Sequence, residues 1–220
     1  MKTIYLISFA LLCSFTMSER KKIDTYNKKR DFKSTPEPKG KKENPTKGLP
    51  TFVIQKHDAS RLHYDLRLEI DGVMPSWAIP KGPSLNYETK RLAMQTEDHP
   101  MSYADFEGII PEGYGAGTVM VWDNGTYQNL RLDKDENLIP MEQCLEEGKI
   151  EIYLYGQKFQ GAFVLFRLKG AKEKNAWIFK KIKDSEASSG KEITETKPNS
   201  ILTKRNLDEI SKNKGGLNKK

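Results

Sequence analysis

Short runs in which apolar and polar residues alternate extend from residue 51 to residue 182, with Gly, Pro and Asn between them. This two-residue period is typical of β-strands with one face in a core. It predicts strands over 51–56, 61–70, 76–79, 118–122, 126–128, 150–155, 162–168 and 177–182, and short helices over 141–147 and 206–212. The DNG sequence at 123–125 predicts a tight hairpin turn. Because no long amphipathic helix separates the strands, we expect a mainly β protein, either an antiparallel barrel or a sandwich.

The first two predicted strands form a hairpin whose register follows from its apolar residues. In 61–70 the even-numbered residues are apolar, and the opposite face carries His63, Asp65, Arg67 and Glu69. With the apolar face in the core, these polar side chains are expected together on one surface. Pairing the strands symmetrically about residue 60 produces the facing pairs Phe52 and Leu68, Ile54 and Leu66, Gln55 and Asp65, and His57 and His63.

The facing histidines predict a metal site. Directly opposed residues have Cβ atoms about 5 Å apart, and Asp65 follows His63 one pleat along the strand. Two imidazoles and a carboxylate can hold a metal ion and leave coordination positions open for water and substrate. Arg67 shares the face, where its planar guanidinium can bind phosphate oxygens. The alternative is a surface strand with unrelated polar residues, and the ligand types leave Mn, Fe and Zn open.

Charge is concentrated outside the predicted strands. The 220 residues have a formal net charge of +7, but residues 17–50 hold eleven Lys/Arg against five Asp/Glu, and residues 183–220 hold nine against six. The segment 51–182 has sixteen against nineteen, a net charge of −3. Blocks of this kind are more often solvated arms than packed structure, and a polyanionic partner is the functional interpretation. The composition, with 36% hydrophobic residues, excludes a multi-span membrane protein, a collagen-like chain and a fully disordered one.

Residues 1–16 contain an apolar run that is too short to span a bilayer comfortably. They are interpreted either as a secretory leader or as the result of a start codon assigned upstream of Met17, and both interpretations exclude them from the fold. The expected organisation is then a basic segment over 17–50, a barrel domain over 51–184 and a basic linker and tail over 185–220. Two cysteines, Cys13 and Cys144, form no disulfide framework, so a reducing compartment is expected.

Other polar residues carry weaker signals. His99 lies in an EDHP sequence at 97–100, where it could donate to a phosphate or protonate a leaving group, although a loop histidine of this kind is more often a surface residue. Lys81 and Arg91 are ordinary basic residues when judged alone. The GYGAG sequence at 113–117 lacks the strand–loop–helix setting of a nucleotide-binding loop.

The run FVIQKHDASRLHYDLRLE at 52–69 resembles the 3'-phosphoesterase domain of bacterial DNA ligase D, which also occurs as a stand-alone protein. The resemblance continues through SWAIPKGP at 76–83, KRLA at 90–93, EDHP at 97–100, YADFEG at 103–108 and IPEG at 110–113. Upstream, YNKKRDF at 26–32 and TPEP at 35–38 also match the family. Together these motifs cover about residues 24–187.

The resemblance implies a single compact β-barrel and a manganese-dependent enzyme, with other divalent metals possible. It implies that this enzyme resects DNA 3' ends carrying a ribonucleotide or a phosphate and leaves a 3'-hydroxyl. Residue by residue, it makes His57, His63 and Asp65 metal ligands, and Arg67, His99 and Tyr103 phosphate contacts. Lys81 and Arg91 match basic residues tied to the phosphomonoesterase step, and Arg30, Asp31, Glu37 and Glu97 match other residues that the activity needs. Part of the N-terminal segment would then fold over the site.

Two departures from the family qualify these expectations. The family usually has one further residue between Gly113 and Tyr114, so the loop is expected to be shortened or re-routed. The sequence shows neither the polymerase nor the ligase module of the longer proteins, so coupling to end joining is not implied by the resemblance, and a separate ligase or polymerase is considered as a partner. We expect a monomer located in the cytoplasm, at the nucleoid, that acts on DNA 3' ends. The rival interpretation is a non-catalytic nucleic-acid-binding barrel with basic arms.

Overall fold

A computed structural model describes residues 23–212 of the chain, so the expectations for residues 1–16, including Cys13, lie outside the described residues. Its strands are β1 (Thr51–Asp58), β2 (Leu62–Leu68), β3 (Val73–Met74), β4 (Ser76–Ile79), β5 (Lys90–Gln95), β6 (His99–Pro100), β7 (Gly108–Ile110), β8 (Gly117–Asn129), β9 (Lys149–Gly156), β10 (Gln160–Arg167) and β11 (Ala176–Lys181). Its helices are the 3₁₀ turn η1 (Met101–Asp105), α2 (Met141–Glu147), α3 (Ile193–Thr196) and α4 (Leu207–Lys212). Residues 23–28 are also helical.

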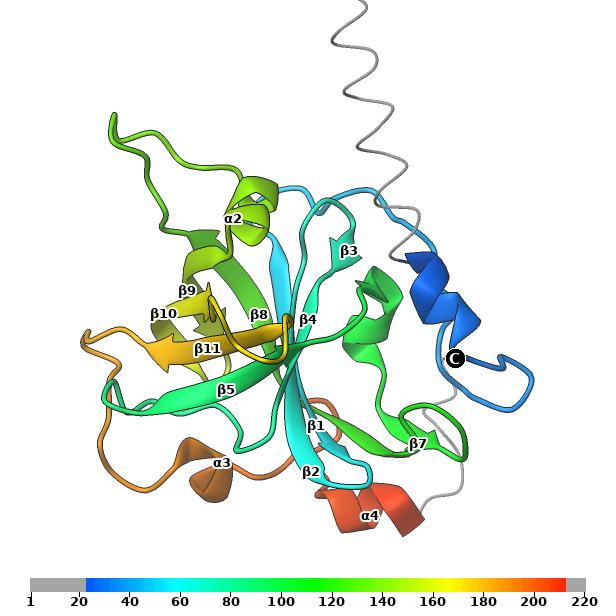
Figure 1. Cartoon of the computed structure of the whole chain (residues 1–220). Coiled ribbons are helices and arrows are strands. Elements are labelled where there is room, and N and C mark those ends of the chain that lie inside the picture. Colours follow the sequence, from blue (N-terminus) through cyan, green and yellow to red (C-terminus); the bar gives the residue numbers. More distant parts are fainter. Residues whose placement is uncertain (1–22, 213–220) are drawn as a thin grey trace, which may run out of the picture.

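Eight antiparallel strands close into a barrel (Figure 1). Their order is β1-β2-β4-β5-β11-β10-β9-β8, and β8 pairs back onto β1. The short strand β7 extends the sheet beyond β8, and β3 pairs with β6 in a separate two-stranded ribbon. The mainly β barrel with few short helices is therefore confirmed. The helix predicted over 141–147 is confirmed residue for residue, and α4 begins one residue later than predicted.

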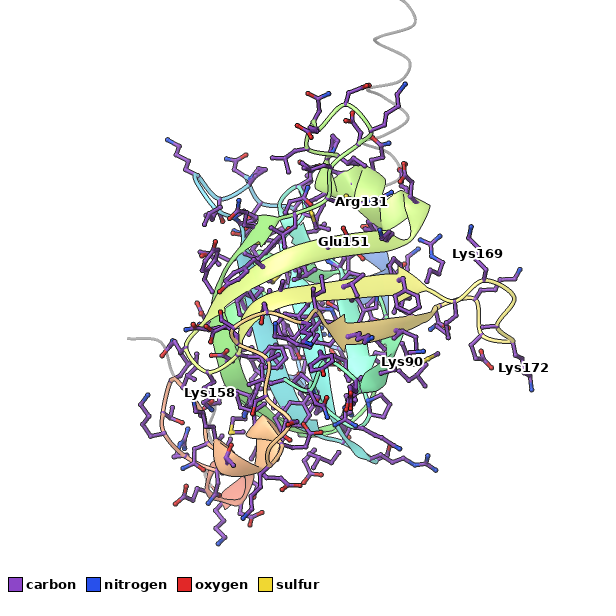
Figure 2. The ribbon with its side chains drawn as sticks, turned by 90° about the vertical axis from the view of Figure 1, so that its left-hand side faces the viewer. Lys90, Arg131, Glu151, Lys158, Lys169 and Lys172 are labelled. Atoms are coloured by element: carbon purple, nitrogen blue, oxygen red, sulfur yellow. The ribbon has the colours of Figure 1, made fainter. Side chains whose placement is uncertain are left out.

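Alternation along the strands separates the barrel core from the outer surface. Trp77, Trp122 and Trp177 are fully buried inside the barrel, and the apolar even-numbered residues of the first hairpin pack around them, except Leu62, which is exposed beside the turn. The predicted register is confirmed, with Phe52 opposite Leu68 and His57 opposite His63. Outward-facing residues of β9 are polar, as Glu151 illustrates in Figure 2. Burial of the apolar face therefore fixes which side chains of the first hairpin point outward.

The predicted hairpin turn at 123–125 is wrong, because β8 runs through it as one strand of 13 residues. Ile54 pairs with Asp123 and Gln55 with Val121, so an extra residue in β8 forms a bulge beside the candidate site. Gly125 is required for a close strand approach instead of a turn, since a Cβ on it would lie 2.1 Å from the carbonyl oxygen of Tyr155 in β9. The sequence therefore indicates correctly that position 125 has a special backbone role, but the reason is the close approach of β9 and not a hairpin turn.

The polar face of β2 is covered, whereas the sequence led us to expect it on the surface. Asp65, Arg67 and Glu69 are all buried. Glu69 accepts hydrogen bonds from the backbone and hydroxyl groups of Thr46 and Thr51, which fix the N-terminal segment against the strand. Figure 1 shows this segment, in blue, beside the green turn of η1, and the rings of Tyr26 and Tyr103 lie 6.0 Å apart. Part of the basic segment is thus packed against the barrel, with Ile23, Tyr26 and Glu37 buried.

The segment after β11, within the expected linker and tail over 185–220, also contacts the barrel. Ile193 and Ile201 are buried, and the backbone N–H of Ile201 donates to Val121 of β8. Glu107 fastens the same segment: it is 3% exposed and accepts hydrogen bonds from Ser200 and from the backbone N–H of Val121. Ile201 packs with Met101 and Ala104, so the C-terminal segment supports the 3₁₀ turn.

Two features of the middle of the chain were not predicted. β5 has no clear alternation of burial, yet it lies between β4 and β11 and completes the barrel. The 3₁₀ turn η1 is too short to produce a periodic signal.

In residues 23–212, no helix is both long and apolar enough to cross a lipid bilayer.

Replacing the buried carboxylate of Glu107 with a methyl group tests the role of the C-terminal segment. Glu107→Ala leaves the Val121 N–H and the Ser200 hydroxyl without their acceptor, and we expect it to lower the free energy of unfolding by about 2 kcal/mol or more. Urea denaturation measures the effect. The matched control Glu146→Ala, on the exposed side of α2, should change stability by less than about 0.5 kcal/mol. Equal stability of the two variants would contradict this account.

Candidate metal centre and phosphate site

Two histidines face each other across the β1–β2 hairpin. The rings of His57 and His63 have centroids 4.8 Å apart, and Asp65 lies below them on the same face. The carboxylate oxygens of Asp65 lie 3.7 Å from His57 Nδ1 and 3.6 Å from His63 Nε2. One ligand atom from each of the three residues falls within 4.8 Å of the others. The three residues converge on one point, as the register predicts.

Backbone carbonyls fix the tautomer of each histidine. His57 Nε2 lies 2.9 Å from the carbonyl oxygen of Gly115, and His63 Nδ1 lies 2.8 Å from that of Arg61. Because a carbonyl can only accept, each of these ring nitrogens must carry the proton. The lone pairs are then on His57 Nδ1 and His63 Nε2, the two atoms that face Asp65. Hydrogen bonding of the remote ring nitrogen in this way is the usual orientation of metal-bound histidine.

The spacing of the three ligand atoms fits a divalent metal better than direct hydrogen bonds. Separations of 3.6 and 3.7 Å are too long for hydrogen bonds. Ligands about 2.1 Å from a tetrahedral metal would lie about 3.4 Å from one another, close to these separations. His57, His63 and Asp65 could therefore hold such an ion after a small contraction. Two imidazoles and one carboxylate suit several metals, so the donor set does not define which one.

Asp65 is held in its anionic form. Burial alone would raise its pKa, but the guanidinium of Arg67, 2.9 Å away, lowers the pKa to about 2. The carboxylate is therefore negatively charged at neutral pH, which is the form that binds metal.

The guanidinium of Arg67 is buried and connects the metal ligands to His99. It donates to Gln55 Oε1 at 2.7 Å and to Asp65 Oδ2 at 2.9 Å, and its Nη1 lies 3.0 Å from His99 Nδ1. Gln55 and Asp65 engage two of its five N–H groups, which leaves donors for an oxygen ligand in the cavity. Gln55 was placed opposite Asp65 by the register but was not recognised as a site residue; its place on the His57 face of β1 is the signal that could have indicated it.

His99 lies between two arginines. It extends from β6, and its Nε2 lies 3.4 Å from Arg30 Nη2, on the other side from Arg67. Burial, followed by the positive charges of Arg67 and Arg30, holds the pKa of His99 well below its usual value. The imidazole is therefore neutral at physiological pH.

A hydrogen-bond network from the N-terminal segment lies beside His99. Arg30 donates to Glu37 at 2.8 Å and to Glu97 at 3.2 Å, and the Tyr103 hydroxyl donates to the same Glu37 oxygen at 3.0 Å. Burial and the charge of Glu37 raise the pKa of Tyr103 well above its usual value, so the phenol keeps its proton. Lys29, from the same segment, pairs with Glu97 at 3.0 Å. The sequence did not single out Lys29, which looks like one of many basic residues there.

These groups surround a cavity of about 310 Å³. Of the expected site residues, its lining contains Arg30, His57, His63, Asp65, Arg67, Glu97, His99 and Tyr103. Four others lie outside the lining. Glu37 is buried behind Arg30 and Tyr103, Asp31 and Lys81 are exposed, and Arg91 forms an ion pair with Glu192 at 2.5 Å.

A closed antiparallel barrel carries a two-histidine, one-carboxylate cluster beside a buried arginine, an arrangement that can bind a metal ion and a phosphate group in one cavity. In a comparison with known families, residues 55–167 match the DNA Ligase D 3'-phosphoesterase domain. The chain belongs to this family.

Longer proteins contain the same domain. The chain is 46% identical over 195 residues to the multifunctional non-homologous end joining protein LigD of Pseudomonas aeruginosa, covering 87% of this chain and 22% of that protein. It is 43% identical over 164 residues to the protein of the same name from Mycolicibacterium smegmatis, covering 74% and 21%. The chain thus spans about a fifth of the length of these relatives.

The depressed pKa of His99 can be tested directly. We expect the His99 ring signals to stay constant in NMR spectra between about pH 8 and pH 6, because burial and two guanidinium groups disfavour the imidazolium. Arg30→Gln removes one of these charges, so the pKa should rise toward the usual value. Titration of wild-type His99 with an ordinary imidazole midpoint would contradict the neutral form.

Proposed function

We propose that the protein is a metal-dependent 3'-phosphoesterase that trims 3'-terminal ribonucleotides and 3'-phosphates from DNA and leaves a 3'-hydroxyl for end repair. The observation that carries this proposal is the convergence of His57, His63 and Asp65 with Arg67 in one cavity. Family membership supports the reaction class. A non-catalytic binding barrel would not need two oriented imidazoles around an ionised, buried carboxylate.

The residues divide the chemistry between them. A divalent ion held by His57, His63 and Asp65, for which we propose Mn²⁺, would supply a Lewis acid and an activated water. Arg67 binds a non-bridging phosphate oxygen through its remaining N–H groups and offsets the charge that develops during hydrolysis. In hydrolysis of a 3'-phosphate, the phosphoryl group passes from the DNA 3' oxygen to water, and that oxygen gains a proton.

His99 is proposed as a phosphate contact instead of a general acid. A neutral imidazole between two guanidinium groups has no readily lost proton to give to a leaving group, but it can hydrogen bond to a phosphate oxygen. Tyr103 keeps its phenolic proton but donates it to Glu37, so its hydroxyl would have to turn away from Glu37 to contact the same phosphate.

The N-terminal residues are proposed to position these contacts. Glu37 holds both Arg30 and Tyr103, and Glu97 holds Arg30 and Lys29. Asp31 is exposed and accepts a hydrogen bond from the backbone N–H of Lys33, so its contribution is to the turn that follows the first helical residues.

The biological setting is proposed from the relatives, whose names assign them to non-homologous end joining. We propose that the protein acts as a monomer on DNA 3' ends, at the nucleoid in the cytoplasm, together with a separate ligase or polymerase. The basic N-terminal segment would guide the DNA backbone toward the cavity, because Arg30 lines the cavity and Lys29 pairs with Glu97 of its lining.

The central experiment is a 3'-end resection assay with added Mn²⁺, on a primer–template that ends in one ribonucleotide or in a 3'-phosphate. His63→Ala should reduce both activities at least about a hundredfold, since even loss of a residue that only orients a metal ligand costs about ten- to a hundredfold. EDTA should abolish wild-type activity. Leu62→Ala, an exposed neighbour on the same strand, should be unaffected. Full activity of His63→Ala with added Mn²⁺ would rule out the proposed centre.

Lys81 and Arg91 are proposed to assist the phosphomonoesterase step from outside the cavity. Arg91→Ala should slow release of a 3'-phosphate by about tenfold, as for loss of a hydrogen bond to a charged group, while ribonucleotide release stays within about twofold. Lys90→Ala, the next residue along β5, is the matched control. An equal loss of both activities in Arg91→Ala would argue against a step-specific role and point to the Arg91–Glu192 ion pair as a structural contact.

A further inference from the structure

The glycine-rich loop between β7 and β8 is fixed to the metal cluster. The carbonyl oxygen of Gly115 accepts the hydrogen bond from His57 Nε2. Gly113 and Gly115 have φ values of 84° and 79°, in the left-handed region that favours glycine. These two residues turn the backbone on either side of Tyr114, which consequently lies at the cavity wall. The loop thus orients one metal ligand and presents an aromatic ring.

Tyr114 is held in place but remains accessible. Its hydroxyl donates to Glu97 Oε2 at 3.1 Å, and Lys29 Nζ lies 4.2 Å from the centre of its ring. Nevertheless, 48% of Tyr114 is exposed, whereas Tyr103, the other tyrosine of the cavity lining, is 2% exposed. An aromatic ring that is anchored by its hydroxyl and left open to solvent is suited to contact with a ligand.

The size of the cavity indicates which part of a DNA end would meet this ring. A volume of about 310 Å³ lies at the lower end of the range for small-molecule sites. A phosphate and its sugar would occupy it, and the attached base would have to rest at the rim. Proteins that hold single-stranded ends commonly stack such bases on aromatic side chains, with cationic groups alongside. Tyr114 and Lys29 provide this pair at the rim.

We propose that Tyr114 stacks on the base of the nucleotide whose 3' oxygen carries the reacting phosphate, and so positions the DNA end. This inference rests on the proposed 3'-phosphoesterase function. That nucleotide is shared by the 3'-phosphate and the 3'-ribonucleotide substrates, so one contact serves both. Stacking tolerates any base, and the site would therefore recognise an end without selecting its sequence.

Kinetics with and without the base test the proposal. Wild-type enzyme is compared on a single-stranded 3' tail that ends in a normal nucleotide 3'-phosphate and on one whose last nucleotide is an abasic tetrahydrofuran 3'-phosphate. Stacking contributes about 1–3 kcal/mol per base, so the normal end should have a KM lower by about fivefold or more. Tyr114→Ser should remove this preference with kcat little changed. Tyr114→Phe, which keeps the ring but loses the hydroxyl, should retain it.

A binding measurement separates this inference from the proposed function. With 2-aminopurine at the last base and EDTA present, wild-type protein should quench the fluorescence by stacking, and Tyr114→Ser should not. Tyr155→Ser is the matched control, because Tyr155 is 43% exposed on β9 and outside the cavity lining. Equal quenching by wild type and Tyr114→Ser, no quenching by wild type, or loss of the preference in Tyr114→Phe would overturn the stacking role. Quenching by a protein that hydrolyses neither substrate would overturn the proposed function alone.

Discussion

The buried guanidinium of Arg67 bonds to Asp65 and Gln55 and lies within hydrogen-bond distance of His99. A buried charge of this kind is tolerated only when its hydrogen bonds are satisfied. The positive charge of Arg67 also sets the protonation states of its neighbours. Asp65 stays ionised and able to bind metal, and His99 stays neutral. Loss of the guanidinium would therefore disturb the metal ligands and the phosphate contacts together.

The pairing of two barrel strands is sufficient to bring most of these groups together. Antiparallel pairing of β1 and β2 brings His57 opposite His63 and Gln55 opposite Asp65, because apolar residues of the same hairpin must face the core. The bulge in β8 lies opposite residues 54 and 55, directly beside this face. The N-terminal segment then covers part of this face through Glu69, and the C-terminal segment, fixed by Glu107, supports the 3₁₀ turn that carries Tyr103. Burial of the site therefore depends on the N-terminal segment and the 3₁₀ turn as well as on the barrel strands.

The sequence was most informative where local periodicity and burial agree. The hairpin register and the convergence of His57, His63 and Asp65 follow from the two-residue period, and the structure has both. The DNG sequence misled because its glycine is required by a neighbouring strand that lies far away in the sequence. The packing of the N-terminal segment against His99 and Tyr103 could not be derived from charge counts, since the lysines and arginines of a free arm and of a packed one look the same. The roles of Gln55 and Tyr114 could not be predicted from the sequence, because they depend on contacts that form only in the folded chain.

The central claim is that His57, His63 and Asp65 hold one divalent ion beside Arg67. Crystals grown with Mn²⁺ and measured at the manganese absorption edge test this claim most directly. The account predicts a single anomalous peak about 2.0–2.2 Å from His57 Nδ1, His63 Nε2 and an Asp65 oxygen. A bound ion elsewhere in the cavity, or an empty three-residue cluster at saturating Mn²⁺, would contradict it.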